Sequence, residues 1–360
     1  MKQIVFFSGS SHQELAYSIS KRLGLPLGKV TLSTFSNGET SVEIGDSVRE
    51  KNVFILQTFD PPHAHSRLME LLIMITSCKT ASAHRVTAVL PLFPYGKAGP
   101  GFASDELLQQ SEIGWHYIPW RPRSGKLIAN LLMVAGADHV ITLDVHDPQC
   151  QGFFNIPFDH LRFQPLLIKW VHENMSTMKR PMIVATSMAQ SMGIDFALIH
   201  DVNPIPSMGH RSIKPITKQP RLVGEVSGRT VLLVDDIAIT CNTLIRAAEM
   251  CLQHGAERVI ALVTHALFAT NVENPADDHL IGELDAKHKE VLTGISLLAS
   301  NMSLSTIVVS NSLPNIAQNT IKKLGSKRIV ILDTAPLLAE AIRRIHFGES
   351  VSYLFDRVAI

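Results

Sequence analysis

Two adjacent carboxylates, Asp235 and Asp236, follow a run of four β-favouring aliphatic residues at 231–234. The run predicts a buried parallel strand, and 244–249 predicts the start of a helix. A Thr-Cys-Asn-Thr turn at 240–243 connects the two. Ligands bind at the carboxyl ends of strands in open α/β sheets, and free amides and hydroxyls at helix N-termini bind phosphate. The segment therefore predicts a site for a phosphorylated sugar, with the paired acids holding its hydroxyls.

These two acids have a simpler interpretation as well. Solvated carboxylates that cap a helix are common in proteins. The position of Asp235 and Asp236 at the end of a buried strand, with Thr240 and Thr243 beside them, favours the ligand site.

A second group of polar residues follows the predicted strand at 139–143. Asp144 and His146 are separated by one residue, so on an extended segment their side chains point the same way. Asp159 lies a short distance downstream. Carboxylate and imidazole together can hold a divalent cation, which for phosphates is usually Mg²⁺. Ligand type alone leaves a structural role for this histidine equally open.

Strand-like and helix-like segments alternate along the chain. Strands are predicted at 4–7, 53–57, 86–90, 139–143, 182–185, 196–199, 230–234, 259–263, 306–309 and 329–332. Helices are predicted at 13–23, 66–80, 125–135 and 165–174. This alternation predicts an α/β fold with two doubly wound parallel-sheet domains, 1–162 and 163–360. Three segments are long for connections in a compact domain: 96–123, 201–220 and 270–304.

Composition excludes several classes of protein. Lys and Arg total 33 against 32 Asp and Glu, so no basic field indicates a nucleic-acid partner. The four cysteines show no Cys-x-x-Cys spacing, which disfavours a zinc site and a disulfide framework. No apolar run approaches the ~20 residues that span a bilayer. We expect a cytoplasmic protein with no membrane and no nucleic-acid partner.

Several motifs in the same order resemble the ribose-phosphate pyrophosphokinase (PRPP synthetase) family. They are the segments 6–12, 35–40, 144–159, 235–243 and 339–350. The similarity covers most of residues 1–95, 124–200, 221–268 and 305–356. It implies two domains of phosphoribosyltransferase type with the active site between them. It also implies that the C-terminal end packs back on the first domain, and that the chain is part of an oligomer.

The resemblance assigns roles to individual residues. Asp235 and Asp236 are expected to hold the ribose hydroxyls of ribose 5-phosphate. The 5-phosphate is assigned to the amides and hydroxyls of Thr240, Cys241, Asn242 and Thr243. Contacts to ATP are assigned to Asn37, Glu39, Lys97 and His146, with the first two reaching the nucleotide of a neighbouring subunit. Mg²⁺ is assigned to Asp144, His146 and Asp159. For Asn37, the local pattern indicates only a turn, because Asn-Gly is a strong turn signal.

This chain departs from the family pattern at three places around the expected site. Ile239 stands where the family usually has an acid, and Asn242 where glycine is usual. Lys97 replaces an arginine, which removes a bidentate fork. The departures lie close to the expected sugar and nucleotide contacts.

Two whole elements of the family pattern are also absent. After 182–185, the pyrophosphate loop and the helix that follows it are missing at 186–192, which leaves only seven to nine residues before the next predicted strand. A parallel connection normally needs about a dozen, so we expect strain in the second sheet. The cationic arm expected after 195–200 is missing as well, since Arg211 is the first basic residue that follows.

The function implied is that of a subunit that transfers pyrophosphate from Mg-ATP to ribose 5-phosphate. The products are PRPP and AMP, for nucleotide biosynthesis. The alternative is a catalytically weak or inactive regulatory partner of active PRPP synthetase subunits. A phosphoribosyltransferase of base salvage is a third possibility, but it leaves the segment 37–39 and the ordered first domain unexplained. Active subunits of the family would be the partners, in a homo- or hetero-oligomer.

Overall fold

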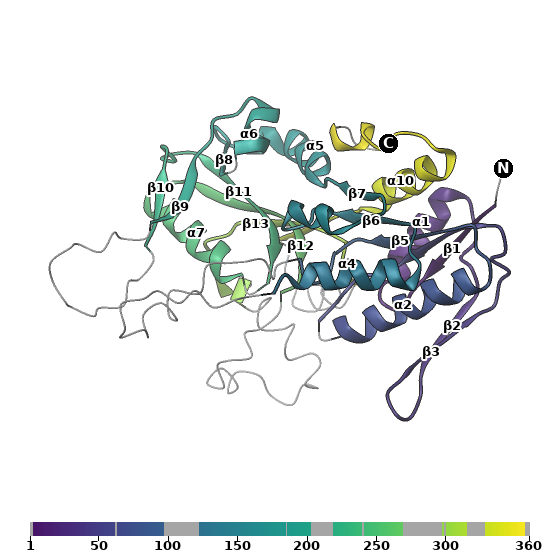
Figure 1. Ribbon diagram of the computed structural model, residues 1–360. Coiled ribbons are helices and arrows are strands. Elements are labelled where there is room, and N and C mark those ends of the chain that lie inside the picture. Colours follow the sequence, from purple (N-terminus) through teal and green to yellow (C-terminus); the bar gives the residue numbers. More distant parts are fainter. Residues whose placement is uncertain are drawn as a thin grey trace.

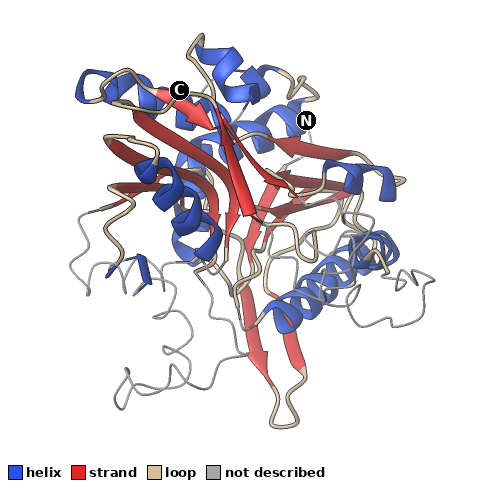
Figure 2. Ribbon diagram, turned by 90° about the vertical axis from the view of Figure 1, so that its left-hand side faces the viewer, coloured by secondary structure: helices blue, strands red, loops and turns tan. Residues whose placement is uncertain are grey.

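The computed structural model describes residues 3–61, 63–96, 122–184, 186–202, 219–239, 241–268, 297–298, 300–314 and 328–356. Within these ranges the strands form two five-stranded parallel sheets, flanked by helices (Figures 1 and 2). The expected α/β fold with two parallel-sheet domains is therefore confirmed. In the described part of the chain, no helix is both long enough and apolar enough to cross a membrane.

The first sheet is built from the N-terminal part of the chain. Its strand order is β1 (Ile4–Ser8), β4 (Asn52–Leu56), β5 (Arg85–Leu90), β6 (His139–Leu143) and β7 (Phe158–Leu161). The helices α1 (Gln13–Leu23), α2 (Ala64–Thr80) and α4 (Ser124–Ala135) accompany it. The 3-10 helix η1 (Pro148–Phe153) lies between β6 and β7. Apart from β7 and η1, which were not predicted, these elements lie within a few residues of the predicted ones, because the apolar runs are long and each is flanked by polar turns.

The second sheet has the order β14 (Ile329–Leu332), β13 (Thr306–Ser310), β12 (Arg258–Ala266), β11 (Thr230–Ala238) and β8 (Met182–Val184). Its helices are α5 (Gln164–Asn174), α6 (Thr186–Met192) and α7 (Asn242–Gln253), with η2 (Met175–Thr177) after α5. Two helices follow β14: α10 (Ala335–Phe347) and α11 (Tyr353–Asp356). The two sheets lie on either side of the predicted boundary at 162 and 163, which itself stays a prediction.

Two antiparallel ribbons complete the fold. The strands β2 (Val30–Thr34) and β3 (Thr40–Ile44) form a hairpin, which projects from the first domain (Figure 1). The strands β9 (Leu198–Val202) and β10 (Gln219–Val223) form the other ribbon, beside the second sheet.

Alternate residues of each strand face opposite layers of the core. In β1, Phe6 and Phe7 are both almost fully buried, yet they enter different hydrophobic clusters. In β11, Leu232 and Leu233 likewise belong to two different hydrophobic clusters. This division follows from the two-residue period of a strand, and it explains why these strands read as continuous apolar runs.

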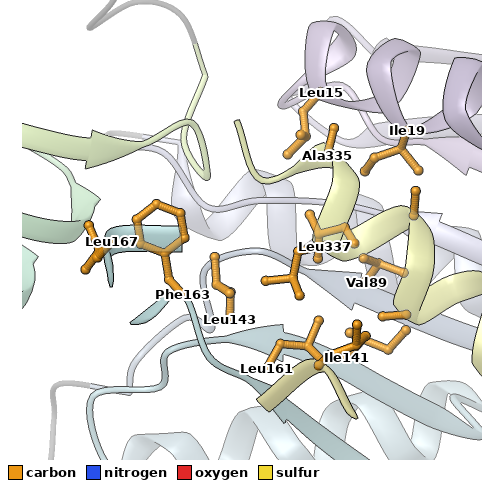
Figure 3. Packing of buried hydrophobic residues seen from close by; sticks show 14 of the residues in the cluster. Leu15, Ile19, Val89, Ile141, Leu143, Leu161, Phe163, Leu167, Ala335 and Leu337 are labelled. Carbon is orange, nitrogen blue, oxygen red and sulfur yellow. The ribbon is translucent and has the colours of Figure 1, made fainter. Parts of the chain in front are cut away.

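One hydrophobic cluster is shared by the two domains. It joins the first-sheet residue Ile141 to the second-sheet residue Leu232, with Phe163 at the junction. Figure 3 shows the part of this cluster where Leu337 of α10 lies close to the residues of the first sheet. The helix α10, which precedes α11 near the end of the chain, packs against α1, from the beginning of the chain (Figure 1). The C-terminal end thus lies against the first domain.

The segment after β8 differs from the expectation. Residues 186–192 are not an empty connection, because they form the short helix α6. The segment predicted as a strand at 196–199 does not join the five-stranded sheet. Phe196 makes a single parallel bridge to Ile183, and β9 then pairs with β10. The expected strain in the second sheet is avoided because the short connection leads out of the sheet. The segments 96–123, 201–220 and 270–304 lie mostly outside the described residues.

Candidate functional site

The paired acids lie at the carboxyl end of β11, as expected for a ligand site. Asp235 and Asp236 are partly buried, and Oδ1 of Asp235 accepts a hydrogen bond from the amide of Asp236 at 2.9 Å. Burial and the neighbouring carboxyl raise the pKa of Asp235 to about 6. Burial also acts to raise the pKa of Asp236, but hydrogen bonds with Asp235 and His146 outweigh it and hold that pKa below its usual range. Near pH 6 the pair therefore combines a proton donor with a carboxylate.

His146 reaches this pair from the first domain. Its Nδ1 donates to Oδ2 of Asp236 at 2.5 Å, across the gap between the segment after β6 and the end of β11. Both side chains are partly exposed, 40% for His146 and 31% for Asp236. The two candidate groups from the sequence, the Asp-Asp pair and the Asp-x-His pair, thus meet in one place.

Asp144 lies deeper than the other acids. Its Oδ2 accepts hydrogen bonds from the Thr264 hydroxyl at 2.6 Å and from the Phe163 amide at 3.2 Å. Burial raises its pKa to about 6 despite these donors. Its backbone has a φ of 36°, in the left-handed region that non-glycine residues rarely adopt. Such strain persists only where neighbouring groups hold it, and here Thr264 and Phe163 do so.

The turn before α7 leads directly into the N-terminus of a helix. Cys241 is buried and adopts a φ of 63°, and the helix begins at Asn242. The amides of Asn242 and Thr243 belong to the first turn, where no intrahelical acceptor is available. Burial raises the pKa of the Cys241 thiol to about 12, so the group is uncharged and can contribute only its main chain. Thr240 lies outside the described residues.

The substitution of asparagine for glycine at 242 has a structural explanation. Among the described residues of the turn, Cys241 has a positive φ, whereas Asn242 is already helical. An asparagine at the first helical position needs no glycine-like freedom. The conformation of the turn is therefore compatible with asparagine at position 242.

The three residues expected to hold Mg²⁺ are not brought together. Asp159 lies on β7, and its Oδ2 accepts a hydrogen bond from Nε2 of His139 at 2.8 Å. His139 is the first residue of β6, whereas Asp144 follows the last one. Among the described residues, no group of three or more histidine, cysteine or acidic side chains is gathered to hold a metal ion. Carboxylate oxygens are ligands that Mg²⁺ prefers, but the described residues do not bring enough of them together to form a metal site.

The residues expected to contact ATP are dispersed. Asn37 and Glu39 are exposed at the tip of the β2–β3 hairpin, where Oδ1 of Asn37 accepts from the Glu39 amide at 3.1 Å. Gly38 adopts a φ of 88° between them, as an Asn-Gly turn requires. Lys97 lies outside the described residues. Of the three that the structure describes, only His146 lies beside the paired acids.

Two residues of β12 that support the site were not predicted from the sequence. Thr264 binds Asp144, and Nε2 of His265 donates to the carbonyl of Leu143 at 2.9 Å. His265 is fully buried, and this burial lowers its pKa to about 4. The signal was available: two polar residues follow the apolar run at 259–263, at the carboxyl end of a strand that neighbours β11.

Comparisons with known proteins identify the family and the fold. Residues 4–104 match the model of the N-terminal domain of ribose phosphate pyrophosphokinase, and residues 185–356 match the phosphoribosyl synthetase-associated domain. The fold is similar to the crystal structure of phosphoribosylpyrophosphate synthetase from Mycobacterium smegmatis. That comparison has 31% sequence identity and a TM-score of 0.72, and it covers 96% of this chain and 100% of the other.

A second solved structure is much less similar. It is adenine phosphoribosyltransferase from Thermoanaerobacter pseudethanolicus, with 13% identity over 46% of this chain and 76% of the other. The TM-score of 0.22 is too low for this likeness to bear on the fold or the site.

Proposed function

Because this chain belongs to the ribose phosphate pyrophosphokinase family, we propose that it is a subunit of that enzyme and binds ribose 5-phosphate at the end of β11. One observation carries the proposal. The paired acids lie near the end of β11, α7 begins a few residues further along the chain, and His146 of the first domain contacts Asp236. A pentose phosphate has hydroxyls for the acids at one end and an anion for the helix N-terminus at the other.

Each group has a distinct role in this proposal. Asp235 and Asp236 accept hydrogen bonds from the ring hydroxyls, and the amides of Asn242 and Thr243 donate to the phosphate. Separation of the two ends matters because carboxylates and phosphate repel each other. Thr240 is included as a further phosphate contact on the family resemblance alone.

The reaction proposed for the assembled enzyme is that of the family, pyrophosphate transfer from Mg-ATP to ribose 5-phosphate. Asn37 and Glu39 are proposed to reach the nucleotide of a neighbouring subunit, which their exposure at the hairpin tip permits. Lys97 and His146 are proposed ATP contacts of this subunit, and Asp144, His146 and Asp159 proposed Mg²⁺ ligands on the resemblance alone. We assign no magnesium-dependent step to this chain, because its described residues do not gather the ligands.

A second candidate function is that of a weakly active or inactive regulatory partner in a homo- or hetero-oligomer of the family. Two observations favour it. β8 ends at Val184 and α6 begins at Thr186, which leaves no room for a loop that would enclose a pyrophosphate. Ile239 places an aliphatic side chain just beyond the paired acids. Loss of one charge-stabilising group costs about 10²–10³ in rate, so a chain without the pyrophosphate loop and the cationic arm of the family pattern would have little turnover.

Calorimetry with ribose 5-phosphate tests the binding proposal. Asp236→Asn should weaken binding about tenfold or more, because a hydrogen bond to a charged group contributes about 1.5–3 kcal/mol. Glu225→Gln, which changes an exposed acid away from the site, should bind like the unaltered protein. Absence of heat with ribose 5-phosphate, or equal affinity of Asp236→Asn, would refute the assignment.

A turnover assay separates the two candidate functions. The purified chain is given Mg-ATP and ribose 5-phosphate, and PRPP and AMP are measured, first alone and then after mixing with an active family member. A rate of about 1 s⁻¹ or more for the chain alone, the lower end of ordinary enzyme rates, contradicts the inactive-partner function. A negligible rate alone, with an altered rate in the mixture, supports it.

A further inference from the structure

The helix α7 and the strand β10 lie beside each other in the second domain (Figure 1), and a groove of about 460 Å³ lies between them. The helix lines this groove with one face, because the residues that it contributes are three or four positions apart: Arg246, Glu249, Met250 and Gln253. Seven helical residues extend about 10 Å. The length and the volume of the groove are therefore those of a site for a small molecule.

Two arginines line the groove, Arg246 from α7 and Arg221 from β10. Both are exposed, and within the described part of the chain neither guanidinium has a hydrogen-bond or ion-pair partner. By contrast, Arg229 of the same domain pairs with Asp195 at 2.6 Å. A guanidinium is a planar fork of donors that matches the oxygens of a phosphate or a carboxylate. The two arginines thus offer free donors to an anion.

The acid that lines the groove is directed to another partner. Glu249 is three residues from Arg246, a spacing that permits an ion pair, yet its Oε1 accepts a hydrogen bond from Nδ2 of Asn301 at 3.1 Å. The described arginines and acid of the groove carry two positive charges against one negative charge. Glu249 therefore reduces the attraction for an anion without cancelling it.

The two ends of the groove differ in polarity. Gln253 is the last residue of α7, and Nδ1 of His254 donates to the carbonyl of Met250 at 2.8 Å. The carbonyl groups at the C-terminus of a helix carry a partial negative charge, so an anion is favoured at the Arg246 end instead. Met250 and Leu222 are partly buried and supply apolar surface, and a methionine side chain adapts readily to a ligand.

We propose that this groove binds a small phosphomonoester with a short apolar body. The phosphate accepts hydrogen bonds from Arg221 and Arg246, and the apolar body lies on Leu222 and Met250. A phosphomonoester carries nearly two negative charges at pH 7, which match two guanidinium groups better than the single charge of a carboxylate or a sulfonate. The first turn of α7, to which we assign the phosphate of ribose 5-phosphate, does not line the groove, so the two proposals are independent.

Calorimetry with three probes tests the class of ligand. Phenyl phosphate has the dianion and an apolar ring, benzenesulfonate has the same ring with one negative charge, and inorganic phosphate has no ring. We expect phenyl phosphate to bind at least about threefold more tightly than either of the others. Each of the others lacks one of the two contacts, the second charge or the apolar body.

Variants locate the binding in the groove. Arg246→Gln and Arg221→Gln should each weaken phenyl phosphate binding about fivefold or more, whereas Arg246→Lys keeps the charge without the fork and should lose less. Glu249→Gln removes the negative charge and should strengthen binding about twofold. Lys21→Gln is the control, because Lys21 is an exposed cation of α1 outside the groove, and it should bind like the unaltered protein.

Three outcomes overturn the proposal: no heat with phenyl phosphate, equal affinity for all three probes, or undiminished binding of phenyl phosphate by folded Arg246→Gln and Arg221→Gln. Calorimetry with ribose 5-phosphate on the same samples keeps the two assignments separate. Loss of phenyl phosphate binding in Arg246→Gln with unchanged binding of ribose 5-phosphate supports a separate site in the groove. Retained ribose 5-phosphate binding by a chain that does not bind phenyl phosphate removes only the groove proposal.

Discussion

Asp144 shows how single contacts set the chemistry of the candidate site. The residue is buried, its backbone is in the left-handed region, and a threonine of the other domain donates to its carboxyl. The type and spacing of Asp144 and His146 predicted a polar site after β6. The donor Thr264 lies 120 residues away along the chain, so local spacing carried no information about the pair.

Removal of that donor should destabilise the protein in a pH-dependent way. Thr264→Val keeps the shape but leaves the ionised Asp144 without its hydroxyl partner, and we expect a loss of about 1.5–3 kcal/mol at pH 8. At pH 5, below the pKa of about 6, the carboxyl is neutral and the loss should fall to about 0.5–1.5 kcal/mol. Urea unfolding at the two pH values measures the difference.

Thr264→Ser is the matched control for this prediction. It keeps the hydroxyl and loses only a buried methyl group, which costs about 0.8 kcal/mol at either pH. A loss for Thr264→Val that does not change between pH 8 and pH 5 would show that the hydroxyl does not support the charged form of Asp144.

At the scale of elements, the short connection after β8 decides what this domain can hold. With α6 starting almost directly at the strand end, the chain crosses the edge of the sheet with one bridge and leaves it for the β9–β10 ribbon. The sequence showed that a loop was missing. It did not show that 186–192 would be helical, because seven residues are too few for a clear helical period.

The helix α10 is the element that ties the end of the chain to the first domain. Leu338 is fully buried in the cluster that α10 shares with α1 and both sheets. Leu338→Ala should lower the free energy of unfolding by about 2–5 kcal/mol, because it leaves a cavity in a close-packed core. Leu127→Ala, at a position on α4 that is 60% exposed, should change it by less than about 0.5 kcal/mol.

Thermal or urea unfolding of the two leucine variants measures this difference. Equal stability of Leu338→Ala and Leu127→Ala would mean that α10 is not part of the cooperative core. A larger loss for Leu338→Ala supports one folding unit that includes both ends of the chain, as the adjacent positions of α1 and α10 in Figure 1 suggest.

At the scale of the molecule, buried hydrogen bonds hold the two domains together beside the shared core. His265 donates from Nε2 to Leu143 of the first domain and accepts at Nδ1 from the Ser312 hydroxyl at 2.8 Å. The Thr58 hydroxyl donates to the carbonyl of Ser312 at 3.0 Å. These bonds require a neutral His265, which its lowered pKa of about 4 provides near neutral pH.

His265 should make the fold sensitive to acid. Its pKa is about 4 when folded and about 6.5 in an unfolded chain, so only the unfolded state takes up this proton between those values. The contribution of His265 to the free energy of unfolding is therefore fully present above pH 6.5 and is lost as the pH falls toward 4. The loss approaches about 3 kcal/mol, at ~1.4 kcal/mol for each pH unit of separation.

The measurement is the difference in unfolding free energy between the unaltered protein and His265→Gln from pH 7.5 to pH 4.5. The two proteins are compared because Asp144 and Asp235 also affect the pH dependence. Their raised pKa values stabilise the folded state as the pH falls, and this effect cancels in the difference between the two proteins. The difference should shrink with falling pH. His172→Gln, at an exposed position, should leave the curve unchanged, and a constant difference for His265→Gln would contradict the assignment.

The sequence by itself determined the two parallel sheets and the strand end that carries Asp235 and Asp236. The spacing of apolar residues in strands and helices and the polar turns between them are local properties of the chain. Tertiary structure alone decided which distant groups meet: His146 with Asp236, Thr264 with Asp144, and Asp159 with His139. Contacts across strands and domains depend on sheet order and register, which no short segment of the chain contains. An apolar cavity beside the acids also depends on the tertiary structure, since both domains supply its walls.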